Sequence, residues 1–364
     1  MKKILFVIGS MNLGGTEKQL FNIIKNLKGF NFEIFTLGEI GYFEDKLKKE
    51  GIKFTQTQTV NFPILKNFLN LINKILRCFI VILKSNPHVI HFLLPQAYIV
   101  GGITSLFFPK IKKVMSRRSM NYYQKNFFLY KYIEVFLHKR MDKIIANSKK
   151  IRDQLIREEH VGKKKIHLIY NGVFDNFPFK KKRSEKIINI LLLANLIPYK
   201  NHEFLIDSCA LLEKRNWKVL FVGKCEPERY EELFLRIKKY NLESNFEFIP
   251  PQQDVFKILQ RADIGVLCSN EEGFSNSILE YMASSLPLVV TDVGGNSEAV
   301  KNNHNGFLIP LNCKKTMSLS LKKLIENKKM RDIMGQNSKK IINKKFTSDI
   351  CLNKYKNFYC NVSK

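Results

Sequence analysis

The sequence has no acidic residue between Glu50 and Glu134, although twelve Lys or Arg fall in that interval. Over the whole chain, Lys and Arg outnumber Asp and Glu by 61 to 32, which gives a formal net charge of +29. Such a charge attracts phosphates, nucleic acids or the anionic face of a membrane. A general lysine bias of the source proteome is the plain alternative, but it explains the acid-free interval less well.

Paired cysteines and long apolar runs are absent too. The seven cysteines are scattered and lack Cys-x-x-Cys spacing, which favours reduced thiols of a cytosolic protein over disulfides or a zinc site. Since no stretch of about 20 apolar residues is free of charge, we expect no transmembrane helix. The short apolar run at the N-terminus favours a buried strand over a signal peptide.

Motifs for metal chemistry and for nucleic-acid recognition are also missing. The sequence shows no metal-ligand cluster, no Ser-His-Asp set and no Asp-x-Asp motif, so we expect neither a metal ion nor another cofactor. No nucleic-acid-binding motif accompanies the basic residues, so we expect no nucleic-acid partner.

The length of 364 residues predicts two domains. Four apolar, β-rich runs lie in the first half, at 3–9, 32–37, 88–93 and 143–146. Helical stretches separate them, which favours a parallel α/β sheet. Thr16 and Gln19 have the spacing of a capping box at the start of a helix over 16–28.

The same pattern restarts after a basic, proline-containing stretch at 177–186, which we interpret as a linker. Five further apolar runs follow, at 188–195, 217–223, 245–250, 264–269 and 287–292. We therefore expect two Rossmann-like, doubly wound α/β domains facing a cleft, over residues 1–178 and 179–345. The tail at 346–364 has helical spacing, and we expect it to pack back on the first domain.

Glu272 and Glu280 stand where a strand ending near residue 269 passes into a helix beginning near 275–277. Ligands of open α/β sheets bind outside the carboxyl ends of the strands. A helix N-terminus at that edge offers free N–H groups and a positive dipole end, which suit a diphosphate. Taken alone, however, the pair is explained more simply as a helix that carries two acids by chance.

Four segments together resemble one family, the retaining glycosyltransferases of family 4, which have the GT-B fold. They are 8–20 (IGSMNLGGTEKQL), 168–175 (LIYNGVFD), 193–202 (LANLIPYKNH) and 269–298 (SNEEGFSNSILEYMASSLPLVVTDVGGNSE). The resemblance covers both expected domains in the right order and is most specific in the second. It implies an enzyme that moves a sugar from a nucleotide diphosphate sugar to an acceptor with retention of configuration.

The resemblance also implies a division of labour on the donor side. Glu272 would face the donor sugar, Glu280 would hold the ribose, and Lys200 would neutralise the departing diphosphate. Without the family, Lys200 would pass for one solvated lysine among many. The remaining donor-side residues are Gly273, Phe274, Ser275 and Asn276, through their backbone N–H groups, and Gly14 and Gly15 of the first domain, where the backbone can approach the phosphates.

One departure from the family concerns the phosphate cations. The family usually carries a second cation, an arginine, where this chain has Asn195, and the apolar Ile197 does not replace it. Arg117 or Arg118 of the first domain is a candidate substitute. We therefore expect Asn195 in the donor site, although it cannot supply the second positive charge.

Smaller departures follow in the second domain. A Gly-x-Gly motif is replaced by Gly223-Lys-Cys, and the segment 248–254, expected to contact the base, lacks the usual glycine, so the base stays open. Ser285 stands where a glycine is common after the helix.

His91 follows an apolar strand at a position where the family often has a histidine that lines the acceptor side. With Glu272 and Lys200 it completes the expected catalytic set, and Arg117 and Arg118 are expected on the acceptor side as well. The alternative for His91 is a hydrogen-bonded histidine at a strand end.

Two segments of the acid-free interval combine apolar or aromatic residues with basic ones, at 67–85 and 112–133. Both fit a surface that touches anionic lipid, and the first also fits a buried domain helix.

We expect a glycosyltransferase that acts on a lipid-linked saccharide in bacterial surface polysaccharide synthesis, such as capsule or O-antigen. We expect it in the cytoplasm, peripheral on the inner face of the plasma membrane. Two alternatives stay open: a non-catalytic GT-B partner of another transferase, and a sugar-nucleotide epimerase.

Overall fold

The computed structural model describes residues 1–57, 66–126, 128–175, 187–213, 216–252 and 254–363. The chain divides into two compact units: Met1–Gly172 with Ser348–Lys364 form unit 1, and Val173–Thr347 form unit 2. The expected linker at 177–186 lies outside the described residues.

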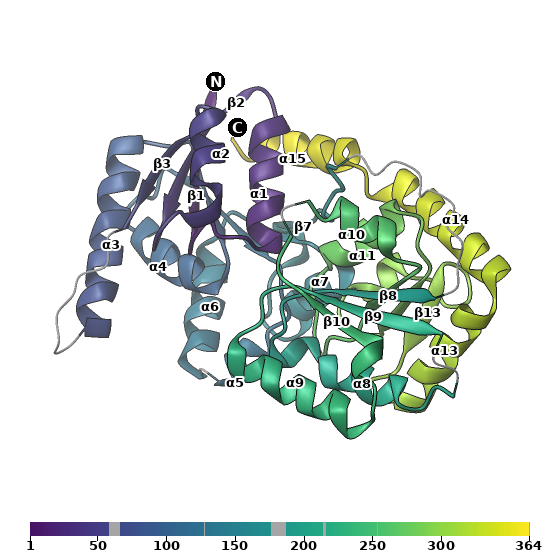
Figure 1. Ribbon diagram of the computed structural model, residues 1–364. Helices are drawn as coiled ribbons and strands as arrows, with labels where there is room; N and C mark the ends of the chain where they lie inside the picture. Colours follow the sequence, from purple (N-terminus) through teal and green to yellow (C-terminus); the bar gives the residue numbers. More distant parts are fainter. Residues whose placement is uncertain (58–65, 127, 176–186, 214–215, 253, 364) are drawn as a thin grey trace. The chain divides into compact units, whose positions relative to one another are not determined.

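Unit 1 is built on a parallel sheet in the order β3-β2-β1-β4-β5-β6-β7 (Figure 1). The strands are β1 (Lys2–Ile8), β2 (Phe30–Thr36), β3 (Lys53–Gln56), β4 (Val89–Leu93), β5 (Lys112–Arg117), β6 (Lys143–Ala146) and β7 (Ile166–Leu168). Residues 4–8 of β1 are at most 1% exposed, because a central parallel strand is covered on both faces and is apolar throughout.

The helices of unit 1 form its outer layers. They are α1 (Gly15–Asn26), α2 (Glu44–Lys49), α3 (Lys66–Ser85), α4 (Pro95–Ser105), α5 (Tyr123–Asn126), α6 (Phe128–Arg140), α7 (Lys149–Arg157) and α15 (Ser348–Val362), with 3-10 turns η1 (Gly41–Phe43) and η2 (Lys163–Lys165). Helix α4 packs against both α3 and α6, and most of its side chains are buried.

The tail forms a helix, as expected, and returns to unit 1. The ring of Tyr359 on α15 lies 6.4 Å from Phe6 and 5.7 Å from Phe30, and Phe358 lies 5.0 Å from His167. Buried aromatic contacts of this kind fix the end of the chain on the first sheet.

Unit 2 repeats the architecture with a parallel sheet in the order β10-β9-β8-β11-β12-β13. The strands are β8 (Ile188–Leu193), β9 (Trp217–Val222), β10 (Phe246–Ile249), β11 (Ile264–Leu267), β12 (Leu288–Thr291) and β13 (Gly306–Ile309). The helices are α8 (His202–Cys209), α9 (Pro227–Lys239), α10 (Phe256–Arg261), α11 (Asn276–Ala283), α12 (Asn296–Ala299), α13 (Lys314–Glu326) and α14 (Lys328–Lys345), with 3-10 turns η3 (Pro198–Lys200) and η4 (Glu243–Asn245).

Two local expectations are wrong. Helix α1 begins at Gly15 with Gly14 as its N-cap, so Thr16 does not cap it. Gln19 instead brackets the backbone of Gly172, donating to its carbonyl at 2.8 Å and accepting from its N–H at 3.3 Å. The loop backbone and this long-range partner decide the helix start, and neither is visible in a local pattern.

The basic and aromatic segment at 112–133 is not one continuous surface. Its first six residues form β5, where the five that follow Lys112 are buried. The lysines and arginine of this segment suggest a polar surface in the sequence. In the sheet, however, most of the side chains of β5 are buried.

Among the described residues, no helix is both long enough and apolar enough to cross a bilayer.

Candidate functional site

The candidate site lies where the strand order of the second sheet reverses. Strands β8 and β11 are neighbours there, although β9 and β10 separate them in sequence. The loop after β8 carries Asn195 and Lys200, and the loop after β11 carries Glu272. Since ligands of open α/β sheets bind at such switch points, these loops form a natural binding edge.

Lys200 and Glu272 meet at this edge. The ammonium of Lys200 lies 2.6 Å from Oε1 of Glu272, and the Ser269 hydroxyl donates to the same oxygen at 2.7 Å. The side chains are 16% and 10% exposed, so the pair is sheltered but reachable. Burial alone would lower the pKa of Lys200, but the Glu272 carboxylate outweighs it and raises that pKa, so the lysine stays charged.

Neighbouring backbone contacts set the position of Lys200. It ends the short turn η3, and Asn201 after it takes a left-handed conformation with φ of 56° before α8 begins. The Asn270 N–H donates to the Tyr199 carbonyl at 2.8 Å, which joins the two loops. His202 is fully buried, and burial lowers its pKa to about 3, so it adds no charge beside Lys200 at neutral pH.

The Glu272 loop rests on a glycine turn after β12. Gly294 has φ of +51°, and a Cβ there would lie 1.7 Å from the Glu272 carbonyl oxygen, so only glycine fits. The Gly295 N–H donates to the Gly273 carbonyl at 2.9 Å. The motif at 290–298 therefore supports the site although it need not touch a ligand.

Helix α11 begins directly after this loop. Ser275 is its N-cap residue and Asn276 its first residue, while Phe274 is buried with its ring 5.2 Å from Phe346. The N-terminus of α11, with its positive dipole end, therefore faces the same edge as Lys200. Glu280 lies half-buried on this helix.

Two side chains of α11 anchor it to the sheet. The Ser277 hydroxyl donates to the Leu193 carbonyl at 2.6 Å, and the Tyr281 hydroxyl accepts from the Leu193 N–H at 2.6 Å. The start of the helix is therefore fixed relative to the end of β8.

The side chain of Asn195 fixes the backbone of the neighbouring loop at Lys224. Its Oδ1 accepts the N–H of Lys224 at 3.1 Å, and the Leu196 N–H donates to the Lys224 carbonyl at 2.8 Å. The loops after β8 and β9 are thus joined at this residue.

His91 lies in unit 1 and is 1% exposed. Its Nδ1 shares a hydrogen bond of 2.6 Å with the Tyr359 hydroxyl, and its Nε2 shares one of 2.7 Å with Ser116. Burial, helped by the nearby charge of Arg118, lowers the pKa of His91 to about 3. This arrangement fits the alternative of a hydrogen-bonded histidine, but His91 lies in the middle of β4 and does not follow the strand.

Arg117 is the centre of a buried ion cluster in unit 1. Its guanidinium pairs with Glu134 at 3.0 Å and with Glu159, and His138 lies 2.7 Å from the same oxygen of Glu159. Arg118 is directed elsewhere, donating to Oδ1 of Asn171 at 2.6 Å.

The carboxyls of the cluster respond differently to their surroundings. Burial would raise the pKa of both, and it prevails at Glu134, whose pKa is raised. At Glu159, the charge of Arg117 and the hydrogen bond with His138 hold the pKa below its usual value.

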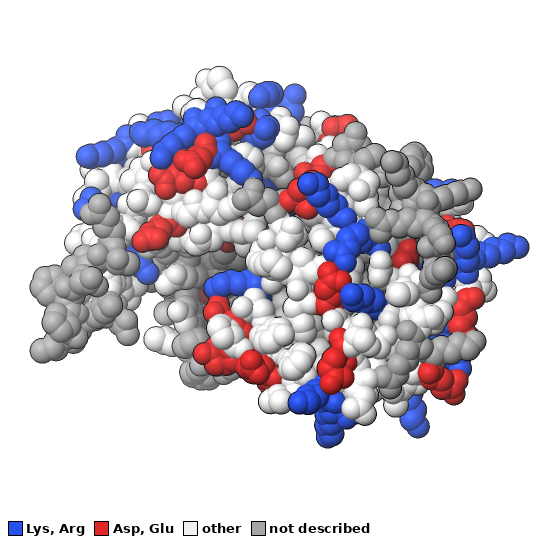
Figure 2. All heavy atoms as spheres, in the orientation of Figure 1, with Lys and Arg blue, Asp and Glu red and all other residues white. Residues whose placement is uncertain are grey.

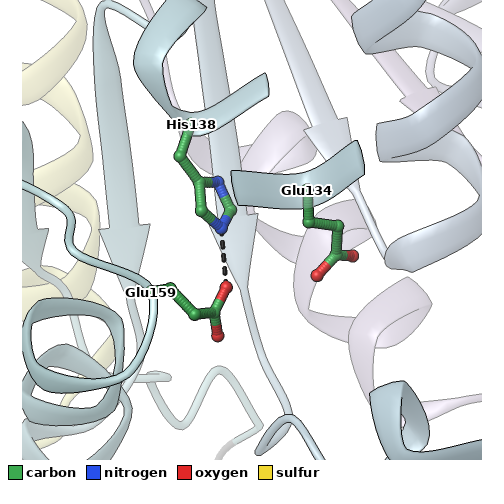
Figure 3. A group of neighbouring side chains, drawn as sticks. All are labelled: Glu134, His138 and Glu159. Atoms are coloured by element: carbon green, nitrogen blue, oxygen red, sulfur yellow. Dashed lines mark hydrogen bonds and ion pairs between the residues drawn. The ribbon is translucent and has the colours of Figure 1, made fainter. Parts of the chain in front are cut away.

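Glu134, His138 and Glu159 place ligand atoms within 4.8 Å of one another, a spacing that could hold a metal ion (Figure 3). Arg117 already contacts both carboxylates, so the positive charge that a metal would bring is supplied by the chain. Sequence reasoning missed this cluster. Its only local signal was the i,i+4 spacing of Glu134 and His138 on α6.

A small, open pocket lies at the carboxyl ends of β4 and β5. Its wall includes Leu94, Tyr98, Arg117, Arg118, Tyr123 and Glu134. Leu94 has φ of +70°, an unusual conformation for a branched residue, and such strain is concentrated at functional sites. Gly14 and Gly15 follow β1, also in unit 1.

Two family models match the chain. The model of the glycosyl transferases group 1 matches residues 173–341, and that of Glycosyltransferase Family 4 matches residues 13–176. The chain is a group 1 glycosyltransferase of the family 4 type. It is thus an enzyme of the nucleotide-sugar glycosyltransferase class.

Curated relatives resemble this glycosyltransferase over most of their length. An uncharacterized glycosyltransferase of Methanocaldococcus jannaschii is 28% identical, over 100% of this chain and 99% of its own. The N,N'-diacetylbacillosaminyl-diphospho-undecaprenol alpha-1,3-N-acetylgalactosaminyltransferase of Campylobacter jejuni is 24% identical, over 91% and 92%.

The fold is that of the GT-B glycosyltransferases. A crystal structure of Anabaena HepE in complex with UDP and glucose superimposes with a TM-score of 0.86 at 21% identity, covering 99% of this chain and all of that one. The two Rossmann-like units expected from the sequence are therefore confirmed.

Proposed function

We propose that the glycosyltransferase transfers a sugar from a nucleoside diphosphate donor to a lipid-linked saccharide, with retention of the anomeric configuration. The observation that carries the proposal is the Lys200–Glu272 pair, which lies at the strand switch point beside the N-terminus of α11. It combines a sheltered cation, a carboxylate and the positive dipole end of a helix at one edge.

The roles follow from the chemistry of each group. Glu272 accepts hydrogen bonds from the donor sugar, and Glu280 accepts them from the ribose hydroxyls. The backbone around residues 273–276 and the dipole of α11 meet the phosphates, where Lys200 stabilises the negative charge that develops as the diphosphate leaves. Positive groups of the chain do this work, so the proposed reaction needs no metal ion.

For the acceptor we propose the pocket of unit 1. Arg117 and Arg118 are in its wall, and His91 supports that wall through Ser116. The relative from Campylobacter jejuni is named for a diphospho-undecaprenol-linked sugar, which supports an acceptor of this class and a role in surface polysaccharide synthesis.

The test is a panel of UDP-, GDP- and other nucleotide sugars, supplied to the purified enzyme with a lipid-linked saccharide. We expect release of one nucleoside diphosphate and a product that keeps the donor's anomeric configuration, measured by NMR. An inverted product would contradict retention, and nucleotide binding without any transfer would contradict the proposed acceptor.

We also propose that the enzyme works at the inner face of the plasma membrane, in contact with anionic lipid through α3. The exposed apolar side chains of this helix are Leu71, Ile72, Leu76, Phe79, Ile80 and Leu83. Arg77 and Lys84 are exposed among them. Apolar side chains with basic neighbours favour the interface of an anionic bilayer.

Charge complementarity supports lipid over another surface. The interval that contains α3 has no acidic residue, although Figure 2 shows acidic and basic side chains interspersed over the visible faces of both units. A helix that carries basic and no acidic side chains is attracted to an anionic surface.

Sedimentation with phosphatidylcholine vesicles, with and without phosphatidylglycerol, tests this contact. We expect binding only with the anionic lipid, release at high salt, and weaker binding after Leu83→Ser. Leu235→Ser on α9 is the matched control, because both leucines are 62% exposed. Binding that is unchanged by salt and by Leu83→Ser would refute the proposed surface.

A further inference from the structure

The proposed donor site needs more positive charge than Lys200 supplies. A departing nucleoside diphosphate carries several negative charges, whereas Lys200 is one cation that already pairs with Glu272 at 2.6 Å. A second cation would share that load, and Asn195 does not provide one.

The two candidate arginines of unit 1 already have partners. Arg117 is 4% exposed and is neutralised by Glu134 and Glu159. Arg118 donates to Asn171.

Two basic residues of unit 2, His202 and Arg229, are also poor candidates for the second cation. His202 is neutral at physiological pH because burial lowers its pKa. Arg229 is 10% exposed and pairs with Glu203 at 2.5 Å and with Glu232 at 2.6 Å. Its charge is balanced by two carboxylates within the fold.

The loop after β9 brings another lysine to the same edge. The Lys224 backbone is bonded on both sides to the loop of Asn195, through its N–H at 3.1 Å and its carbonyl at 2.8 Å. Gly223 permits this approach, because a Cβ there would lie 2.2 Å from the Ala194 carbonyl oxygen. Lys224 is thus attached to the position where the family carries its arginine.

We propose that Lys224 is the second cation of the donor diphosphate, supplied from the β9 loop in place of an arginine at position 195. The inference rests on the proposed donor site. Asn195 then has a positioning role, because its amide oxygen holds the backbone from which the Lys224 side chain extends.

The present partner of Lys224 is easily exchanged. Its ammonium lies 2.6 Å from Glu226, in a pair whose side chains are 70% and 62% exposed. Such surface pairs contribute little, whereas a diphosphate offers more charge and more acceptor oxygens. Lys224 can therefore leave Glu226 for the donor.

Calorimetric titration with UDP, UMP and uridine tests the proposal, with the guanosine series run in parallel. Lys224→Gln should weaken diphosphate binding about tenfold and leave nucleoside binding unchanged, because one charge-assisted contact to phosphate is lost. Lys224→Arg should keep the affinity. Lys238→Gln is the control, since Lys238 is exposed near the other end of α9.

Two further variants should act in the opposite direction. Asn195→Arg in the Lys224→Gln background should restore diphosphate affinity by returning a cation to the neighbouring loop. Glu226→Gln should raise the affinity, because it removes the competing carboxylate.

The outcomes separate this inference from the proposed function. If the unaltered enzyme binds no nucleoside diphosphate, the donor site itself is wrong. If it does bind, and Lys224→Gln behaves like Lys238→Gln, the donor site stands and Lys224 is not its cation. An equal loss for uridine and UDP would show a structural role only.

Discussion

Two groups of charged side chains, one in each unit, differ in what they leave available to a ligand. In unit 1, Arg117 and its two carboxylates are at most 4% exposed. In unit 2, Lys200 and Glu272 are 16% and 10% exposed and lie beside a helix N-terminus. The first cluster balances its charges internally, whereas the second can exchange partners.

We infer from the contrast that burial and partners distinguish a cluster that balances its own charges from a pair that a ligand can reach. Both groups join a cation to acids across distant parts of the chain. A buried charge that loses its partner is strongly unfavourable, whereas a reachable pair can rearrange around a substrate. Stability and activity should therefore respond separately to substitutions in the two groups.

The largest effect is expected for Arg117→Met. Two buried carboxylates lose their counter-charge, so the free energy of unfolding should fall by about 3–5 kcal/mol. Urea denaturation measures it, with the exposed Arg157→Met as a control that should change little. Unchanged stability would mean that the cluster does not hold unit 1 together.

Lys200→Ala should affect mainly activity. Loss of a positive group at the leaving diphosphate should lower kcat/KM about 100- to 1,000-fold. Glu272→Ala should be comparably impaired, whereas Lys238→Ala should not. Full transferase activity in Lys200→Ala would show that the Lys200–Glu272 pair does not act on the donor.

His91 extends the comparison to a buried group that is uncharged at neutral pH. Since burial lowers its folded-state pKa to about 3, the unfolded chain binds the proton first as the pH falls. The neutral His91 therefore contributes fully to the free energy of unfolding above about pH 6.5. This contribution is lost as the pH falls towards 3, and about 3 kcal/mol of it is lost at pH 4.

Urea denaturation at pH 7 and pH 4 checks this prediction. His91→Gln should lose less stability on acidification than the unaltered enzyme, and the exposed His304→Gln should lose as much. Equal losses in all three would show that other groups govern the acid sensitivity.

The smallest effect concerns backbone strain in unit 2. Ser285 has φ of +57° after α11, a conformation that favours glycine. Ser285→Gly should raise the free energy of unfolding by about 0.5–1 kcal/mol without changing activity. A loss of activity would show that the end of α11 matters to the site as much as its start.

The sequence by itself determined the strand pattern and much of the donor edge. The apolar runs that became β1, β4, β8 and β11 are visible locally, because parallel strands are covered on both faces. The loop between β11 and α11 could be placed between Ser269 and Asn276, because the apolar run of β11 ends just before it.

Only the tertiary structure decided which charged residues are buried among their partners and which stay within reach of a ligand. Lys200 and Glu272 are 72 residues apart, and His91 meets Tyr359 across 268 residues. Arg117 and Arg118 are adjacent in sequence, yet one is buried among carboxylates and the other is not. Burial and pairing arise from contacts between distant segments, so a local pattern contains the residue type but not its environment.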